Sequence, residues 1–158
     1  AIRKAHEMGW KPLQLMISTS ASVSATLKPA GLEASKGVIT SITMKFPGDP
    51  AWANDKGMQD YYAFVRQWAP SEDPNESIGA FGYSQAMMIV ELLRRCGDEL
   101  TRENLMRVAE SVDGWQFDTL VPGIRIKTSP TDHGTIEQMQ LMRFDGTRWV
   151  LFGDLMES

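Results

Sequence analysis

The fold is decided by residues 81–112, which read FGYSQAMMIVELLRRCGDELTRENLMRVAESV. Apolar side chains recur at helical spacing through the first half of this stretch, which predicts one long helix. Its main apolar face comprises Tyr83, Ala86, Met87, Val90 and Leu93, and a second stripe beside it comprises Ile89, Leu92 and Cys96. An apolar surface this wide is usually buried on two sides, as in a helix that lies against a sheet.

A tight turn and a second helix follow the first. Arg94 and Arg95 occupy the last turn of the long helix, where cations interact favourably with the helix dipole. Gly97 is expected to end that helix in a left-handed conformation, and Thr101 is expected to cap the next one. The second helix has one apolar face, made of Leu105, Val108, Ala109 and Val112.

Composition places the chain among ordinary globular proteins. The 158 residues are 42% hydrophobic and 23% charged, enough for a domain with a real core. The net charge of −4 gives no electrostatic basis for binding nucleic acid or an anionic membrane. No apolar run approaches the roughly 20 residues of a membrane span. Cys96 is the single cysteine, so we expect no internal disulfide and a buried, inert thiol.

The N-terminal residues read as one half of an α/β unit. Residues 1–8 predict a helix closed by Gly9, and residues 13–17, LQLMI, predict a short buried parallel strand. A small polar loop, STSASVSA, follows at residues 18–25. Ligands of open α/β sheets bind beyond the carboxyl ends of strands, where Ser18, Thr19 and Ser20 would lie. The alternative is that these hydroxyls only cap the next short helix, and the residues alone leave both open.

The other elements alternate between strand and helix patterns. Residues 38–46 show the period of two that predicts a strand, and residues 58–68 predict an amphipathic helix that stops before Pro70. Residues 121–127 predict another strand. Residues 138–144 and 148–152 predict a hairpin, because an Asp-Gly turn joins two apolar runs.

The sequence lacks the motifs that mark the common catalytic and metal-binding sites. No G-x-S-x-G, Walker A or G-x-G-x-x-G motif occurs, and His6 and His133 are expected at the surface. One cysteine and two distant histidines are too few for zinc. Asp49 and Asp55 lie in turn-like segments and are interpreted as solvated. We therefore predict no catalytic residue, no metal site and no cofactor, and hence a protein that is not an enzyme.

Two longer segments carry a family resemblance. Residues 82–106, GYSQAMMIVELLRRCGDELTRENLM, and residues 122–154, PGIRIKTSPTDHGTIEQMQLMRFDGTRWVLFGD, resemble the branched-chain-amino-acid-type (Leu/Ile/Val-binding) periplasmic solute-binding proteins of ABC importers. The resemblance extends over essentially the whole chain. It implies an α/β fold of the type I periplasmic binding class, with three α/β/α layers, parallel sheets and two lobes. It matches only the C-terminal part of such a protein, so we expect a fragment that contains parts of both lobes.

The resemblance also implies a domain organisation and a function. Residues 1–43 would belong to the second, C-terminal lobe, residues 44–114 to the first lobe, and residues 115–158 to a crossover that returns to the second. The protein would capture a small amino acid or organic acid in the periplasm and deliver it to ABC permease subunits. A missing N-terminal part of the same protein, or a second copy of the chain, is the expected protein partner. The alternative is a ligand-sensing domain of a regulator or receptor with the same fold.

For the ligand site, the resemblance favours Ser18, Thr19 and Ser20 from one lobe with Phe81 and Tyr83 from the other. The aromatics would lie at the N-terminal end of the long helix, where free N–H groups can hold a carboxylate. The competing interpretation is a plain aromatic core contact. Thr19 stands where branched-chain-amino-acid binders carry an acidic residue that pairs with the ligand's ammonium group. A neutral residue cannot form that bond, so a carboxylate without an amine is the expected ligand.

Overall fold

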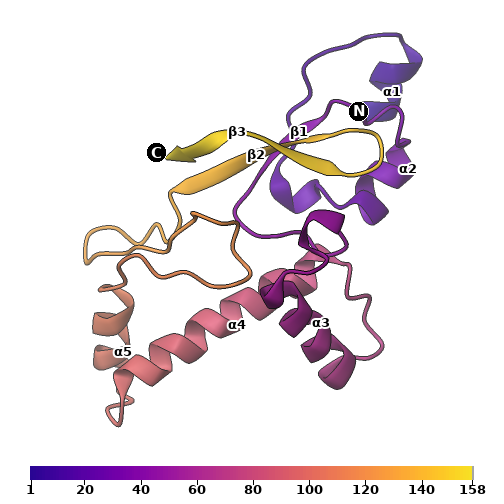
Figure 1. Cartoon of the computed structure of the whole chain (residues 1–158). Helices are drawn as coiled ribbons and strands as arrows, with labels where there is room; N and C mark the ends of the chain where they lie inside the picture. The colour runs from indigo at the N-terminus through magenta and orange to yellow at the C-terminus, as the bar shows by residue number, and fades with distance from the viewer. Residues whose placement is uncertain (158) are drawn as a thin grey trace. The chain divides into compact units, whose positions relative to one another are not determined.

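The structure, a computed structural model, describes residues 1–157 and divides into two compact units. Unit 1 comprises residues 1–42 and 139–156, and unit 2 comprises residues 43–138 with Glu157. The chain thus passes from unit 1 into unit 2 and back again. Figure 1 colours the chain by residue number, so these ranges can be followed along it. That unit 1 belongs to the second lobe and unit 2 to the first stays a prediction.

Unit 1 is built around a three-stranded sheet. The strands β1 (Ile39–Ile42), β2 (Gln138–Phe144) and β3 (Trp149–Glu157) lie in the order β1-β2-β3. β1 runs antiparallel to β2, with Ile39 opposite Arg143 and Ile42 opposite Gln140. The remaining elements are short: α1 (Ile2–Glu7), η1 (Ser18–Ser20), η2 (Val23–Leu27) and α2 (Lys28–Ala30). β1 is shorter than the predicted strand at 38–46, because Met44 pairs instead with Leu120.

The predicted hairpin is confirmed. The backbone N–H of Asp145 donates to the carbonyl of Arg148 at 3.0 Å. The Asp145 carboxylate in turn accepts from the N–H groups of Thr147 (2.7 Å) and Arg148 (2.8 Å). Gly146 has φ = +107°, a conformation that residues with a Cβ rarely adopt. The turn residues thus fix the register in which β3 returns along β2.

The core of unit 1 forms where this sheet meets the N-terminal residues. The rings of Phe144 and Trp149 meet edge-on, with centroids 5.5 Å apart. The Trp149 indole N–H donates to the carbonyl of Ala21 at 2.8 Å, and all three residues are buried. Leu27, which is also fully buried, ends the η2 turn.

Residues 13–17 pair in parallel as predicted, but the prediction that they are buried is wrong. The segment pairs with β1 in parallel through a bridge between Leu15 and Ile39. However, Leu13, Leu15 and Ile17 expose 76%, 74% and 68% of their surface, because no described residue packs over that side. Within residues 1–157 this bridge is the one parallel pairing found; β1 and β2, as well as the other isolated bridges between named pairs, are antiparallel.

Unit 2 contains three well-formed helices, and the predicted helix-turn-helix is confirmed. These are α3 (Lys56–Trp68), α4 (Ser77–Cys96) and α5 (Arg102–Ala109), preceded by the single turn η3 (Pro50–Trp52). Gly97 ends α4 with φ = +59°. The Thr101 hydroxyl accepts from the N–H of Asn104 at 3.2 Å and so caps α5.

The long helix α4 differs from its prediction in its start and in its buried face. It begins at Ser77, about one turn before Phe81, and buries Ala80, Ser84, Leu92 and Cys96. Ala80 packs with the α3 core residues Met58, Tyr61 and Val65. The predicted face is largely open, since Ala86, Val90 and Leu93 are exposed. Among the described residues, α4 is therefore covered on one side and not on two.

Residues 110–137 of unit 2 are irregular, and some of their apolar side chains are buried. The predicted strand at 121–127 is absent, and a bridge joins Trp115 to Ile126 by two backbone hydrogen bonds of 3.1 and 2.8 Å. Val121, Ile124 and Ile126 are nevertheless buried, so the segment contributes to the core without forming a strand.

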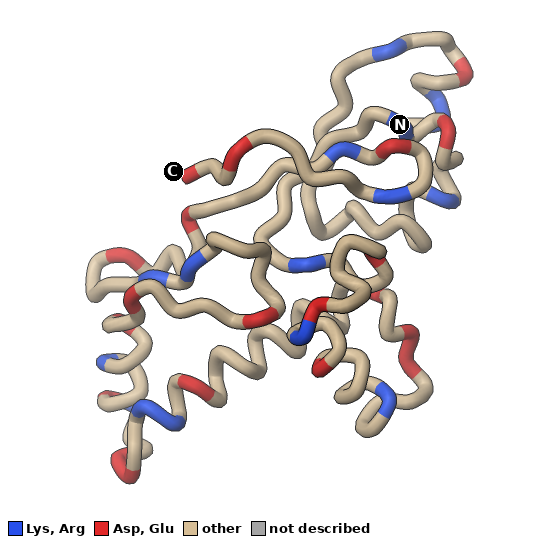
Figure 2. The backbone as a smooth tube through the Cα atoms, viewed as in Figure 1, with Lys and Arg blue, Asp and Glu red and all other residues tan. Residues whose placement is uncertain are grey.

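Charged residues of both signs are interspersed along the backbone (Figure 2). This distribution agrees with the absence of an electrostatic basis for nucleic-acid binding in the composition. Among the described helices, none combines the length and apolar character needed to span a bilayer.

Candidate functional site

The hydroxyl-rich turn at Ser18–Ser20 follows directly on the parallel bridge of unit 1. The N–H of Met16 donates to the carbonyl of Ile39, and the N–H of Ile39 donates to the carbonyl of Gln14, both at 2.9 Å. These bonds give residues 13–17 the direction of a parallel strand, so the turn lies at its carboxyl end. This is the position that the sequence predicted for it.

The side chains of this turn are available to a ligand. Ser18–Ser20 form one turn of 3-10 helix, closed by the N–H groups of Ser20 and Ala21. Thr19 and Ser20 are exposed, and none of the three hydroxyls bonds to another described side chain or backbone group. The capping role considered for them belongs to Ser22, whose hydroxyl accepts from the N–H of Ala25 at 3.1 Å. The structure thus removes the alternative assignment.

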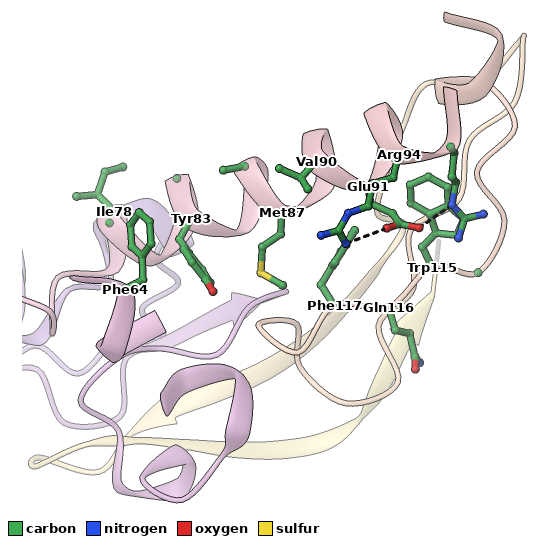
Figure 3. Close-up of a pocket in the computed structure, with 15 residues that line it drawn as sticks. Phe64, Ile78, Tyr83, Met87, Val90, Glu91, Arg94, Trp115, Gln116 and Phe117 are labelled. Atoms are coloured by element: carbon green, nitrogen blue, oxygen red, sulfur yellow. Dashed lines mark hydrogen bonds and ion pairs between the residues drawn. The ribbon is translucent and has the colours of Figure 1, made fainter. Parts of the chain in front are cut away.

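A groove runs along α4 in unit 2. It has a volume of about 920 Å³ and is mostly apolar (Figure 3). Its lining includes Phe64, Ile78, Tyr83, Met87, Val90 and Phe117. The Tyr83 ring packs between Phe64 and Tyr61, with centroid distances of 5.1 and 5.5 Å. Burial first, and then the charge of Asp60, raises the pKa of Tyr83, so its hydroxyl stays protonated and can donate a hydrogen bond.

One end of this groove carries charge. Glu91 accepts from Arg95 at 2.8 Å and lies 3.9 Å from Arg94 (Figure 3). The Arg95 guanidinium also stacks 4.0 Å from the centre of the Trp115 ring. With two cations and one carboxylate, this end keeps one positive charge in excess.

The two predicted aromatics lie on different sides of α4. They are two positions apart on a helix and therefore project about 200° from one another. Tyr83 lines the groove, whereas Phe81 is 51% exposed and is not part of the groove lining. Both lie beyond the first turn of α4, so their N–H groups belong to the helix ladder. The predicted carboxylate site at the free N–H groups of these residues is therefore wrong.

A buried charged cluster in unit 2 was missed by the sequence reasoning. Lys45 is only 6% exposed, and its ammonium group donates to the Asp55 carboxylate at 2.7 Å and to the carbonyl of Asp118 at 2.6 Å. It also lies 5.5 Å from the centre of the Trp52 ring. Asp55 was interpreted as solvated, but it pairs with Lys45 and caps α3 by accepting from the N–H of Met58 at 3.1 Å.

The Asp55 carboxyl has a shifted pKa for identifiable reasons. Burial alone would raise the pKa of Asp55, but the hydrogen bonds from Lys45 and Met58 and the charge of Lys45 outweigh it and hold the pKa below its usual value. An Asp just before a helical pattern is a capping signal that could have been noticed. Lys45 had no such signal, because its acceptor at Asp118 lies 73 positions along the chain.

The two histidines and the cysteine lie where the sequence predicted them. His133 Nε2 lies 3.4 Å from Glu110, and His6 is exposed on α1. Cys96 is buried, as predicted. Within residues 1–157, no group of three or more His, Cys, Asp or Glu side chains is arranged to hold a metal ion.

Comparison with solved structures shows the fold. A branched-chain amino acid ABC transporter protein from Thermus thermophilus, solved with bound valine, matches 99% of this chain at 18% identity and a TM-score of 0.80. A possible leucine/isoleucine/valine-binding protein from Rhodopirellula baltica matches 96% of it at 16% identity and a TM-score of 0.73. A fatty acid ABC transporter substrate-binding protein from Thermomonospora curvata matches 99% of it at 18% identity and a TM-score of 0.62. The chain spans only 42%, 38% and 40% of these proteins, respectively.

Comparison at the level of families is more direct. No curated protein sequence matches the chain significantly. The model of the periplasmic binding protein family, by contrast, matches residues 1–148. This match confirms the resemblance carried by residues 82–106 and 122–154, and the solved structures confirm the type I periplasmic binding fold. The chain therefore belongs to the periplasmic binding protein family.

Proposed function

We propose that this chain is part of the extracytoplasmic solute-binding component of an ABC importer. The observation that carries the proposal is the family match over residues 1–148. Solved structures of the same fold are described as ABC transporter proteins for branched-chain amino acids or a fatty acid. The corresponding role here is to capture a small solute, in the periplasm or its equivalent, and to present it to permease subunits. No covalent step is needed for that role, so we expect no catalytic turnover.

We propose that the ligand is a small carboxylate and that its polar head binds at Ser18, Thr19 and Ser20. The support is local to unit 1: the hydroxyls have no partner among the described residues, and the turn ends a parallel-paired segment. The loop at 18–25 contains no acidic residue. An ammonium group would therefore find hydroxyl acceptors there but no carboxylate to pair with. An acid without an amino group does not need that ion pair and so gives up no binding free energy for lack of it.

In unit 2, Tyr83 is the better placed of the two predicted aromatics for contact with an apolar ligand body. It offers a half-buried ring and a protonated hydroxyl on the groove wall. Phe81 stays in the proposal as a second, exposed contact on another side of α4.

The ligand proposal is tested by calorimetry with a matched pair of compounds. Leucine and 4-methylpentanoate differ only in the amino group, so their affinity ratio reports how the site treats an ammonium. We expect the chain to bind 4-methylpentanoate more tightly. Thr19→Glu should shift the preference toward leucine by about 1.5–3 kcal/mol, the contribution of a hydrogen bond to a charged group. Thr19→Gln is the control, because glutamine has nearly the size of glutamate but carries no charge.

Several results would contradict the proposal. Tighter binding of leucine than of 4-methylpentanoate by the unaltered chain would show that an ammonium partner exists elsewhere. An equal effect of Thr19→Glu and Thr19→Gln would remove the charge argument. If Tyr83→Ala changed no affinity, Tyr83 would not contact the ligand.

A further inference from the structure

Residues 43–45 and 119–121 form a short antiparallel pair, which we call the crossing ladder. We infer that Lys45 is a positioning residue that holds the crossing ladder against helix α3 and thereby makes residues 43–45 a rigid part of unit 2. The N–H of Lys45 donates to the carbonyl of Thr119, and the N–H of Val121 donates to the carbonyl of Thr43, both at 3.0 Å. Two such bonds do not by themselves make a stable pair of strands. The inference does not depend on the proposed ligand.

Each contact of the Lys45 ammonium group reaches a different segment. Asp55 is the N-cap of α3, Asp118 precedes the second strand of the ladder, and Trp52 ends the η3 turn. A buried ammonium group is costly unless it is paired and hydrogen-bonded, so the segments that supply its partners are held together. The 6% exposure of Lys45 makes solvent a poor substitute for any of them.

The start of α3 also packs closely against the backbone at Asp118, the residue that precedes the second strand of the crossing ladder. A Cβ on Gly57, in the first turn of α3, would lie 2.3 Å from the carbonyl oxygen of Asp118. The start of α3 is therefore in direct contact with the peptide whose oxygen Lys45 binds. On the other side of the ladder, the Thr119 hydroxyl hydrogen-bonds to Ser84 of α4 at 2.6 Å, and both are buried.

The crossing ladder that Lys45 holds begins immediately after β1. Ile42, the last residue of β1, is paired with Gln140. Thr43, the next residue, already belongs to the crossing ladder. No unpaired residue separates the two paired regions. The Ile42–Thr43 peptide is therefore the whole connection between the paired residues of β1 and those of the crossing ladder.

Amide hydrogen exchange, followed by NMR, tests the inference on the full chain. The reporters are the N–H groups of residue 45 and Val121, which form the ladder. Lys45→Met keeps the apolar length of the side chain and removes the charge. We expect both amides to exchange at least about tenfold faster, because local opening becomes easier, while amides of α5 keep their rates. Lys56→Met is the matched control: it removes a neighbouring lysine that pairs with Asp60 at the surface, and we expect no change.

A second variant keeps the test decisive if Lys45→Met does not fold. Asp55→Asn retains an oxygen that can cap α3 but has no charge for Lys45. It should accelerate exchange of the same two amides, by a smaller factor, and spare α5. Unchanged exchange of residue 45 and Val121 in the folded variants would overturn the inference. Equal acceleration throughout unit 2 would also overturn it, because Lys45 would then support the core in general and not the ladder.

Discussion

Two apolar stretches of unit 1 have similar patterns and different fates. β2 lies in the middle of the sheet, and its Met142 and Phe144 are buried. Residues 13–17 have an equally apolar sequence, yet Leu13, Leu15 and Ile17 are exposed. The difference lies in their neighbours: β2 has a strand on each side, whereas residues 13–17 have one bridge to β1. The pattern therefore determines which side chains align on a face, and the neighbouring elements determine whether that face is buried.

Helix α4 shows the same contrast between its two sides. The side with Ala80, Ser84, Leu92 and Cys96 is covered by other parts of unit 2. The side with Val90 and Leu93 is exposed, although its residues are larger and more apolar. Hydrophobicity alone would have assigned the burial the other way round.

The largest expected effect separates β2 from residues 13–17. Phe144→Ala removes a fully buried ring that contacts Trp149, and it should lower the free energy of unfolding by about 3–5 kcal/mol. Leu15→Ala, in the other stretch, should change it by less than about 0.5 kcal/mol, because the side chain is exposed. Urea unfolding followed by circular dichroism measures both. Comparable losses in the two variants would mean that residues 13–17 are buried in solution.

A smaller effect separates the two sides of α4. Cys96 is buried, so a polar thiol reagent should label it slowly in the native chain and rapidly after unfolding. A variant with Cys96→Ala and Val90→Cys carries its thiol on the open side. We expect native-state labelling about a hundredfold faster in this variant, since no opening of the structure is required. Fast labelling of Cys96 itself would contradict the burial of its side of the helix.

Features determined within a few residues were predictable from the sequence. The Thr101 cap, the Gly97 helix end and the Asp145-Gly146 turn each depend on contacts between near neighbours. Their residue types specify the local conformation almost without regard to the rest of the fold. The start of α4 was missed because the signal is absent there: the N-cap position is Glu76, which makes no side-chain capping hydrogen bond.

Features that join distant segments were not predictable in this way. The pattern of residues 38–46 predicts a strand that includes Lys45, but its partner Asp118 lies 73 positions away and no local rule connects them. In the candidate site, the position of Ser18–Ser20 after a parallel-paired segment was predicted correctly. The relation of Phe81 to Tyr83 was not, because it depended on where α4 begins.

The smallest expected effect concerns the Asp145-Gly146 turn. This turn places β3 beside β2, whereas residues 13–17 have no second strand beside them within residues 1–157. The N–H groups of Arg148 and Thr147 donate to the Asp145 carboxylate and lower its pKa. A lowered pKa means that this carboxylate stabilises the folded chain at pH values above the ordinary Asp value of about 3.9, and that the stabilisation is lost as the pH falls through the folded-state value. Asp145→Asn keeps an acceptor oxygen without the charge. The unaltered chain should therefore be the more stable of the two near neutral pH, and the two should converge in acid. Urea unfolding of both proteins between about pH 2 and pH 7 gives this difference, with the other acidic groups cancelling because they are common to both. A difference that does not vary with pH would mean that the carboxylate does not bind these N–H groups, and the register of β2 and β3 would then rest on the Gly146 turn and the side-chain pairs alone.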